Sequence, residues 1–215
     1  MGREKGAFYG IVVGLEAEAR IARRLGVPVA VGGGGPAGAA VAAEQLVDEG
    51  ATALVSFGLA GGLDPSLRAG ALVVPGHVLA EDGQWPTDPA LSAMLGGYSH
   101  GTLYGDGTIL ATVAAKQALH ARTGAVAVDL ESAAVARTAT RHGLPFAVLR
   151  AICDPARRGL PLAALVALDS KGRIGALRIA GAVLVRPWEI PALITLGRDA
   201  SLARRALLDR VEAIR

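Results

Sequence analysis

Short apolar runs alternate along this chain with segments that repeat apolar residues at helical spacing. Each run is flanked by glycine, proline or polar residues and is too short for a helix, which predicts a buried strand. These runs are residues 9–15, 27–31, 52–57, 71–75, 125–128 and 146–152. The segments between them favour helices at residues 16–25, 39–48 and 132–142. Strands that alternate with helices are typical of an α/β fold with parallel strands.

Two longer segments follow this alternation less closely. Residues 81–107 are rich in glycine and proline and are expected to form a long loop, and residues 108–121 become helical toward their end. Residues 188–215 are expected to form one or two helices, because apolar residues recur there at helical spacing with arginines between them. Such a helix either packs on its own core or lies on an anionic membrane surface. The chain is expected to be a single domain, residues 1–215, with a C-terminal helical extension at about 186–215.

Carboxylates follow two consecutive predicted strands. Residues 129–131, Asp-Leu-Glu, come after one strand, and Asp154 comes after the next. A strand–helix–strand unit with parallel strands would place Glu131 and Asp154 at the same edge of the sheet, where α/β proteins bind ligands. Arg150 lies inside an otherwise apolar strand and must meet an anion, because an unpaired buried charge is very costly. The simpler alternative is a structural ion pair, with Glu131 capping its own helix.

The same arrangement recurs near the N-terminus, where Glu16 and Glu18 follow the first predicted strand. Acidic residues are also favoured in the first turn of any helix, because the helix dipole stabilises them. The position alone therefore fits either a ligand site or a helix start.

Residues 32–38 form a glycine-rich turn between a predicted strand and a helix. Such a turn lets backbone N–H groups approach a phosphate or a sugar hydroxyl closely. Gly33, Gly35 and Gly38 also match the dinucleotide fingerprint, but that site needs an acidic residue after the next strand. That strand ends in residues 58–62, Gly-Leu-Ala-Gly-Gly, which disfavours a dinucleotide site.

The composition narrows the classes of function. Of the 215 residues, 52% are hydrophobic, which is enough for one sizeable core. The best candidate for a membrane span, residues 174–185, is too short and contains Arg178, and no secretory signal is expected. The single cysteine, Cys153, excludes an internal disulfide and suits a reducing cytoplasm. A net charge of +3 with 4% aromatic residues does not favour nucleic-acid binding, and the four histidines show no metal-ligand spacing.

Three motifs then occur in a fixed order. They are V-V-G-L-E-A-E-A at residues 12–19, F-G-L-A-G-G-L-D-P-S-L-R-A-G-A-L-V-V-P at 57–75, and A-V-D-L-E-S-A-A-V-A with L-R-A-I-C-D at 127–136 and 149–154. Together, over residues 9–156, they resemble the nucleoside phosphorylase superfamily, and within it the methylthioadenosine/S-adenosylhomocysteine nucleosidases. The resemblance implies a three-layer α/β/α sandwich with a central mixed, mostly parallel sheet.

The C-terminal pattern R-P-W-E-I-P-A-L-I-T-L-G-R-D-A, residues 186–200, resembles a narrower group, the hopanoid-associated phosphorylases. These are taken to remove adenine from adenosylhopane, a membrane triterpenoid intermediate. The resemblance implies a cytoplasmic homo-oligomer that acts on a nucleoside, here a lipid-linked one, with peripheral membrane contact through the C-terminal helix. It implies no metal and no cofactor, and inorganic phosphate stays open as a co-substrate.

The resemblance also assigns catalytic roles. Asp154 matches the general acid that protonates the purine, and Glu18 matches the carboxylate that positions an attacking water. Arg150 matches the arginine beside the nucleophile. A phosphate nucleophile would instead bind Arg150 and the backbone N–H groups of Gly33, Gly34 and Gly35. The sequence leaves water and phosphate both open.

The substrate contacts are assigned in the same way. Glu131 matches the carboxylate that binds ribose hydroxyls, and Leu130 falls where a methionine usually packs on the sugar. Thr108 replaces an aromatic residue that stacks on the base, and Leu59 replaces a serine, so the pocket is more apolar than in the nucleosidases. The remaining predicted contacts are Asp129, Ile109 and Gly61.

These patterns favour an enzyme that cleaves the N-glycosidic bond of an adenine nucleoside, with adenosylhopane as the substrate and water or phosphate as the nucleophile. A methylthioadenosine/S-adenosylhomocysteine nucleosidase and a general purine nucleoside phosphorylase are the nearest alternatives. A dinucleotide-dependent oxidoreductase is a more remote one. A non-catalytic module that binds a lipid or a nucleoside would not need Glu18, Glu131, Arg150 and Asp154 together.

Overall fold

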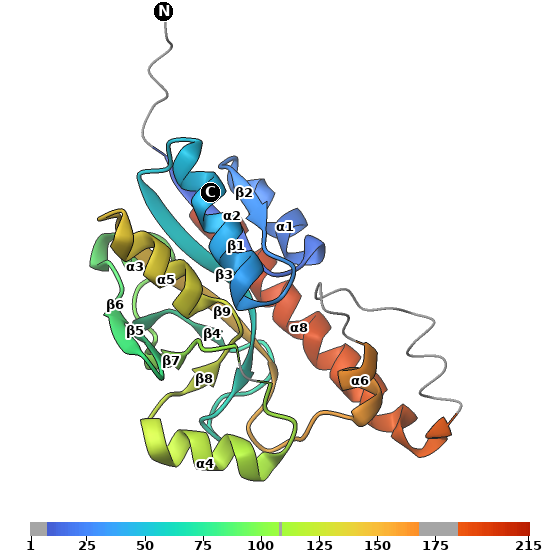
Figure 1. The fold of residues 1–215 in the computed structure, drawn as a ribbon. Coiled ribbons are helices and arrows are strands. Elements are labelled where there is room, and N and C mark those ends of the chain that lie inside the picture. Colours follow the sequence, from blue (N-terminus) through green and yellow to red (C-terminus); the bar gives the residue numbers. More distant parts are fainter. Residues whose placement is uncertain (1–7, 108, 168–184) are drawn as a thin grey trace, which may run out of the picture.

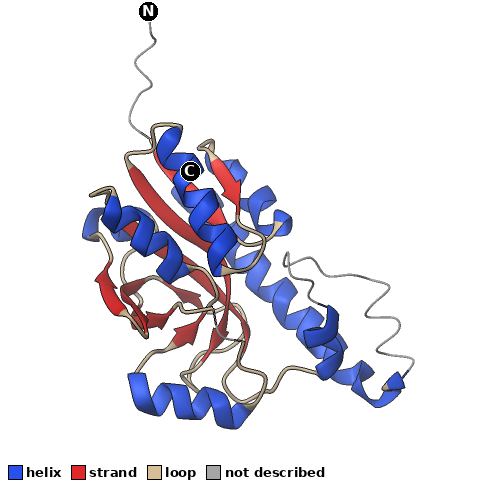
Figure 2. Cartoon of the chain, in the orientation of Figure 1, coloured by secondary structure: helices blue, strands red, loops and turns tan. Residues whose placement is uncertain are grey.

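The computed structural model describes residues 8–107, 109–167 and 185–215. A curled sheet of nine strands forms the middle layer, and helices cover both of its faces (Figures 1 and 2). The strands are β1 Tyr9–Val13, β2 Val29–Val31, β3 Ala53–Gly62, β4 Leu72–Val73, β5 Pro75–Ala80, β6 Gly83–Pro86, β7 His100–Tyr104, β8 Ala127–Val128 and β9 Phe146–Asp154.

The sheet order is β2-β1-β3-β8-β7-β5-β6, and β9 lies beside both β3 and β4. Pairing is parallel between β1 and β2, β1 and β3, β3 and β9, β5 and β7, and β7 and β8. It is antiparallel between β3 and β8, β4 and β9, and β5 and β6. The mixed, mostly parallel sheet between two helical layers is therefore confirmed.

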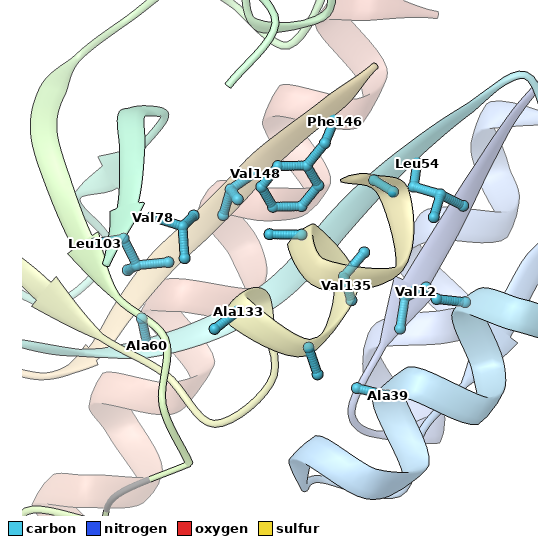
Figure 3. Close-up of a cluster of buried hydrophobic side chains, with 14 of the residues drawn as sticks. Val12, Ala39, Leu54, Ala60, Val78, Leu103, Ala133, Val135, Phe146 and Val148 are labelled. Atoms are coloured by element: carbon cyan, nitrogen blue, oxygen red, sulfur yellow. The ribbon is translucent and has the colours of Figure 1, made fainter. Parts of the chain in front are cut away.

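One helical layer packs on the face of the sheet that Figure 3 shows. Its helices are α2 Pro36–Asp48 and α5 Ser132–Arg141. Small residues such as Ala39 of α2 and Ala133 of α5 are fully buried there, which lets both helices approach the strands closely. Val12, Val148 and Leu54 fill the space between helix and sheet (Figure 3).

The opposite face carries a second set of helices. These are α1 Glu16–Ala22 with the short 3-10 turn η1 Arg23–Leu25, α3 Pro89–Met94, and α8 Ile190–Ile214 after the turn η2 Pro187–Glu189. Ala203, Leu207 and Val211 recur along one side of α8 and are fully buried against strand residues such as Phe57 and Leu149. The C-terminal segment thus packs on its own core through this stripe.

Helix α4 Val113–Thr123 lies away from these two layers, whereas α6 Leu162–Ala167 lies beside α8 (Figure 1). Leu119 of α4 packs with Leu63, Tyr104 and Val128 in a third, smaller core near the end of β3. This packing brings α4 next to the carboxyl ends of β3 and β9, where the candidate site lies.

The prediction that the strands before and after α5 are parallel neighbours is wrong. β8 pairs antiparallel with β3 through Gly61–Val128, whereas β9 pairs parallel with the same strand. The acidic ends of β8 and β9 still come close, because Val128 and Asp154 are both register partners of Gly61. Proximity of the carboxylates therefore comes from β3, which both strands pair with.

Several element boundaries also differ from those predicted. Residues 81–107 contain β6, α3 and β7 where one long loop was expected. The sequence did not show these elements because they are short and their turns are too closely spaced for a hydrophobic period to appear. β3 continues through its glycines to Gly62, since pairing with β8 and β9 compensates for their weak strand propensity. Of the one or two helices expected in residues 188–215, the structure forms one long helix, residues 190–214.

The apolar stretch at residues 174–185 lies almost entirely outside the described residues. Within those described, no helix combines the length and the hydropathy that crossing a bilayer requires.

Candidate active site

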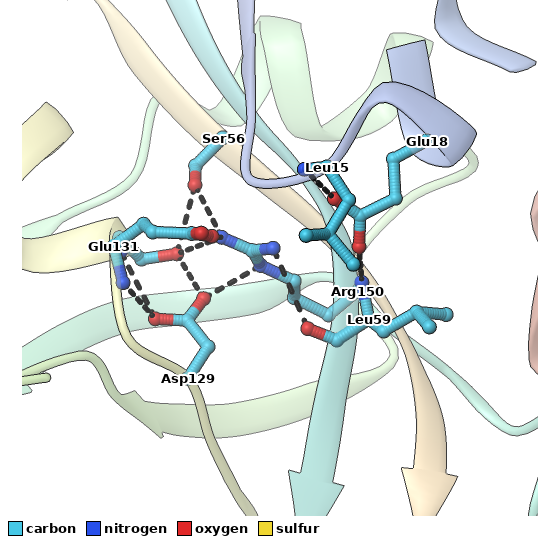
Figure 4. A network of polar contacts seen from close by, with 8 residues as sticks. Leu15, Glu18, Ser56, Leu59, Asp129, Glu131 and Arg150 are labelled. Carbon is cyan, nitrogen blue, oxygen red and sulfur yellow. Dashed lines mark hydrogen bonds and ion pairs between the residues drawn. The ribbon is translucent and has the colours of Figure 1, made fainter. Parts of the chain in front are cut away.

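Arg150 is the centre of the candidate site (Figure 4). Its side chain is 1% exposed, on β9. Nη2 donates hydrogen bonds to Ser56 Oγ at 2.7 Å, to Glu131 Oε2 at 3.0 Å and to Ser132 Oγ at 3.3 Å. Nε lies 2.6 Å from Asp129 Oδ2, in an ion pair without hydrogen-bond alignment. The anion that the sequence required is therefore a pair of carboxylates on the segment between β8 and α5.

Asp129 holds this segment in place as well as pairing with Arg150. Its Oδ1 accepts hydrogen bonds from the backbone N–H groups of Glu131 at 3.1 Å and Ser132 at 3.0 Å. Its Oδ2 accepts from the Ser132 hydroxyl. The carboxylate thus satisfies N–H groups at the start of α5, which have no partner within the helix. Both oxygens of Asp129 thus bind protein groups, and its contact with a substrate stays a prediction.

Glu18 approaches the same cluster from the first turn of α1. Its Oε2 accepts from Leu15 N at 2.8 Å, and its Oε1 accepts from Leu59 N at 2.9 Å. A Cβ atom at Gly58 would lie 2.6 Å from Glu18 Oε1 and 2.7 Å from Arg150 Nη1, so the two charged groups flank this glycine. Burial raises the pKa of the Glu18 carboxyl, against the lowering effects of Arg150 and of the N–H groups that it accepts from.

Glu131 is a second buried carboxylate of this cluster whose pKa is raised. Burial raises its pKa to about 7, Arg150 opposes the rise, and Glu18 and Asp129 add to it. A Cβ at Gly14 would lie 2.1 Å from Glu131 Oε1, so only glycine leaves room for this side chain. At neutral pH a ligand that donates hydrogen bonds to Glu131, such as a diol, would favour its ionised form.

This raised pKa predicts how the stability of the protein depends on pH. Glu131 binds its proton more tightly in the folded protein than in the unfolded chain. Its contribution to stability is therefore fully present below the pKa that it has in the unfolded chain, and is lost as the pH rises toward the folded pKa of about 7. Relative to Glu131→Gln, the free energy of unfolding of the wild type should therefore fall between pH 5 and pH 7.5. Urea unfolding at both pH values measures this.

The matched control is Glu16→Gln on the exposed surface of α1. Arg23 lowers the pKa of Glu16, which is therefore already ionised across this range. The difference between the wild type and this variant should stay constant from pH 5 to 7.5. An equally constant difference for Glu131→Gln would show that Glu131 is ionised throughout.

Asp154 lies at the end of β9, four residues beyond Arg150. At the usual rise per residue their Cα atoms are about 13 Å apart along the strand. The pairing of β9 with β3 shifts register between Ala60 and Gly61, so Cys153 is an extra residue and the strand bends before Asp154. A Cβ at Gly61 would lie 3.8 Å from Asp154 Oδ2. No described hydrogen bond joins Asp154 to the Arg150 cluster.

Asp154 has its own buried partner, Lys116 of α4. Lys116 Nζ lies 2.6 Å from Asp154 Oδ2, and the lysine side chain is 1% exposed. Burial raises the pKa of Asp154, Lys116 and Arg158 lower it, and Asp199 raises it. Burial has the largest effect, so the pKa of this carboxyl stays above its ordinary value.

The structure places the other predicted residues as follows. Leu59 contributes its backbone: its N–H binds Glu18 and its carbonyl accepts from Arg150 Nη1 at 3.4 Å. A Cβ at Gly107 would contact Pro36 at 3.2 Å and the Leu130 carbonyl at 3.8 Å, so this loop adjoins the start of α2 and residue 130. Leu130 is half-buried and Ile109 is exposed. Thr108 lies outside the described residues.

The glycine-rich turn has a structural explanation. Gly33 and Gly34 have left-handed backbones, and Gly35 is the N-cap of α2. A Cβ at Gly38 would lie 1.7 Å from the Gly32 carbonyl oxygen, so the turn packs directly on the helix. Close packing therefore accounts for the spacing that matched the dinucleotide fingerprint. Within the described part of the chain, no three His, Cys, Asp or Glu side chains are grouped to hold a metal ion.

Three polar side chains of this region were not predicted. Ser56 and Ser132 are fully buried and hydrogen-bond to each other at 3.0 Å as well as to Arg150. Ser56 is the one polar residue inside the apolar run 52–57 after Thr52, and that interruption is a signal that could have indicated it. Lys116 gave a weaker signal, because a lysine in a helix is usually exposed.

An α/β sheet that gathers carboxylates and a buried arginine near the ends of its central strands defines an enzyme-like site for a small polar ligand. The chain belongs to the phosphorylase superfamily, whose family model matches residues 21–96 and 85–166. The family and the enzyme class predicted from the motifs are confirmed by this match. No curated protein matches the sequence significantly.

Solved structures share the fold over nearly the whole chain. A Helicobacter pylori methylthioadenosine nucleosidase mutant with 5′-methylthioadenosine in its active site has a TM-score of 0.67 at 17% identity, covering 97% of this chain and 99% of that one. The Neisseria meningitidis 5′-methylthioadenosine/S-adenosylhomocysteine nucleosidase has the same score and identity, covering 96% and 99%. Futalosine hydrolase of H. pylori also reaches 0.67 at 17%, covering 96% and 98%.

Proposed function

We propose that this protein hydrolyses the N-glycosidic bond of an adenine nucleoside and releases adenine. The observation that carries the proposal is the gathering of Glu18, Glu131 and Arg150 in one buried cluster, with Asp154 at the end of the strand that carries Arg150. The family match and the nucleosidase and hydrolase neighbours support the same reaction class.

The chemistry of these groups suits the two halves of the reaction. Adenine leaves poorly as an anion, so Asp154, whose pKa is raised by burial, would give its proton to the base as the bond from the sugar carbon to nitrogen breaks. The bonding electrons stay on the adenine, and the sugar carbon becomes cationic. Ionised Glu131 would hold the sugar hydroxyls and place negative charge near that cation.

A water molecule would complete the reaction from the opposite face. Its oxygen forms the new bond to the sugar carbon, and one of its protons passes to Glu18. The raised pKa of Glu18 suits this, because a carboxylate that holds protons more tightly is a stronger base. Products are adenine and the free sugar.

The charges of the cluster favour water over phosphate. Glu18, Asp129 and Glu131 bring three carboxylates to the single guanidinium of Arg150, and that guanidinium is already bound by two of them. A phosphate anion would have to enter beside these carboxylates without a free counter-charge, which like-charge repulsion opposes. Arg150 is therefore better explained as the group that holds the carboxylates than as a phosphate site.

We further propose adenosylhopane as the substrate. Residues 186–200 carry the pattern that resembles the hopanoid-associated group, and this region exposes large apolar side chains. Trp188 is 71% exposed and Ile194 56%, with Arg198 among them. An apolar and basic surface of this kind suits peripheral contact with an anionic membrane that supplies a lipid-linked nucleoside. Sedimentation with anionic and neutral vesicles tests that contact, and equal recovery with both would contradict it.

The proposal predicts the outcome of a substrate panel. Adenosine, methylthioadenosine and adenosylhopane are incubated with the protein, with and without phosphate, and adenine, free sugar and sugar phosphate are separated by chromatography. We expect adenine and free sugar at rates that phosphate does not change, with adenosylhopane favoured at least about tenfold in kcat/KM. Preference for methylthioadenosine would identify the nucleosidase alternative instead.

Two outcomes would count against hydrolysis. Sugar phosphate that forms only with added phosphate would show phosphorolysis. No adenine from any of the three nucleosides would remove the proposed function, and tight binding of a reduced nicotinamide dinucleotide would then support the oxidoreductase alternative.

A further inference from the structure

Lys116 is the one lysine among the residues that the structure describes, and it is 1% exposed. Besides Asp154 Oδ2 at 2.6 Å, its ammonium donates to the backbone carbonyls of Asp154 at 3.2 Å, Pro155 at 3.1 Å and Arg158 at 2.9 Å. These acceptors lie at the end of β9 and on the turn that follows it. Thr112 caps the N-terminus of α4, through Ala115 N at 3.1 Å, and so fixes the first turn that presents Lys116.

We propose, on the basis of the function proposed above, that Lys116 is a positioning residue for Asp154. Its ammonium fixes the carboxylate at the end of β9 and limits how far burial can favour the protonated form. Lys116 donates a hydrogen bond to Oδ2 of Asp154, and none of the described residues donates one to Oδ1 of Asp154. That leaves Oδ1 as the oxygen that would deliver the proton to the base.

The charged and titratable groups around Asp154 come from four elements. Lys116 comes from α4, Arg158 from the turn after β9, Asp199 from α8, and Cys153 is the preceding residue. Arg158 Nη1 pairs with Asp199 Oδ2 at 2.6 Å. The positive charge from the turn and the negative charge from α8 therefore act in opposite directions on the pKa of Asp154. Burial, with Asp154 beside it, raises the pKa of Cys153 to about 12, so the thiol stays neutral in the range of interest.

The inference makes a signed prediction for the pH profile. A general acid must hold its proton, so kcat/KM falls above its pKa. An opposite charge at this distance lowers the pKa of a carboxyl group by about 1–3 units. Removing the Lys116 charge should therefore raise the pKa of Asp154, so that Asp154 keeps its proton to a higher pH. In Lys116→Gln the alkaline limb of kcat/KM should therefore move upward by at least about one pH unit, while kcat falls because the carboxylate is no longer fixed.

Two other variants separate charge from structure. Lys116→Arg keeps the charge, so its limb should stay within about half a pH unit of the wild type while kcat falls. Asp199→Asn removes the charge that opposes Lys116, so its limb should move downward. Arg122→Gln is the matched control: it removes a positive charge from the same helix, where Arg122 forms an exposed pair with Glu81, and should leave the limb in place.

The experiment measures kcat/KM from pH 5 to 10 for these variants, with folding checked by circular dichroism. A folded Lys116→Gln variant whose alkaline limb of kcat/KM stays at the wild-type pH would overturn the inference. Lys116 would then have only a structural role, in holding the turn after β9. If that variant does not fold, a limb displaced by a full unit in Lys116→Arg would overturn it instead. Failure of the proposed function looks different, because the wild type would then release no adenine at any pH.

Discussion

Replacement of Asp154 by asparagine is expected to lower kcat for adenine release about 10²–10⁴-fold, the usual contribution of a general acid. Asparagine keeps the size of the side chain and can still accept a hydrogen bond from Lys116, but its amide is not acidic enough to transfer a proton to the leaving base. KM should change much less than kcat, because the loss falls on the step in which the bond to adenine breaks. Steady-state kinetics on the best substrate of the panel measure both.

Stability and local charge need their own controls for this variant. Asp154→Asn leaves the buried Lys116 without its counter-charge, so the assay must run well below the melting temperature of the variant. Asp82→Asn is the matched substitution, in an exposed pair with Arg137, and should keep wild-type kcat. A folded Asp154→Asn variant that turns over adenosine at close to the wild-type rate would place the proton donor elsewhere.

Replacement of Arg150 by methionine should produce a large loss of stability. Arg150 is the only cation that contacts Asp129 and Glu131 among the described residues, and removing it leaves both carboxylates buried without a counter-charge. Breaking a buried pair in this way costs about 3–5 kcal/mol. The free energy of unfolding in urea at pH 7.5 measures the loss.

The control for this loss is Arg23→Met in the exposed pair with Glu16. A surface ion pair contributes at most about 1 kcal/mol, so this variant should stay close to the wild type. The Arg150→Met loss should shrink at pH 5, where Glu131 is protonated and needs no counter-charge. An Arg150→Met variant as stable as Arg23→Met would show that the cluster does not depend on this guanidinium.

How much of the site could be predicted from the sequence is clearest at Arg150. A permanent cation inside an apolar strand requires an anion, and the structure supplies Asp129 and Glu131. The sequence could not tell that two carboxylates would share it. That depends on β8 pairing antiparallel with β3, and two residues, Ala127 and Val128, are too few to show a direction.

Lys116 is a residue of the site that could not be predicted from the sequence. Nothing in the pattern of α4 distinguishes it from an exposed lysine, because its burial comes from the turn after β9 folding over the helix. The long tail shows a similar limit. Its periodicity predicted helix, but only packing on β3 and β9 decides that residues 190–214 form one continuous helix with Leu207 on the buried side.

The central claim is that Glu18, Glu131, Arg150 and Asp154 act as one site that adds water to the sugar carbon as adenine leaves. The direct test is a single turnover in ¹⁸O-labelled water with phosphate present, quenched at once with borohydride so that the free sugar cannot exchange its oxygen, and followed by mass spectrometry. We predict one ¹⁸O in the sugar alcohol, none in the adenine, and no sugar phosphate. Unlabelled sugar phosphate as the product, or intact nucleoside after many turnover times, would contradict the account.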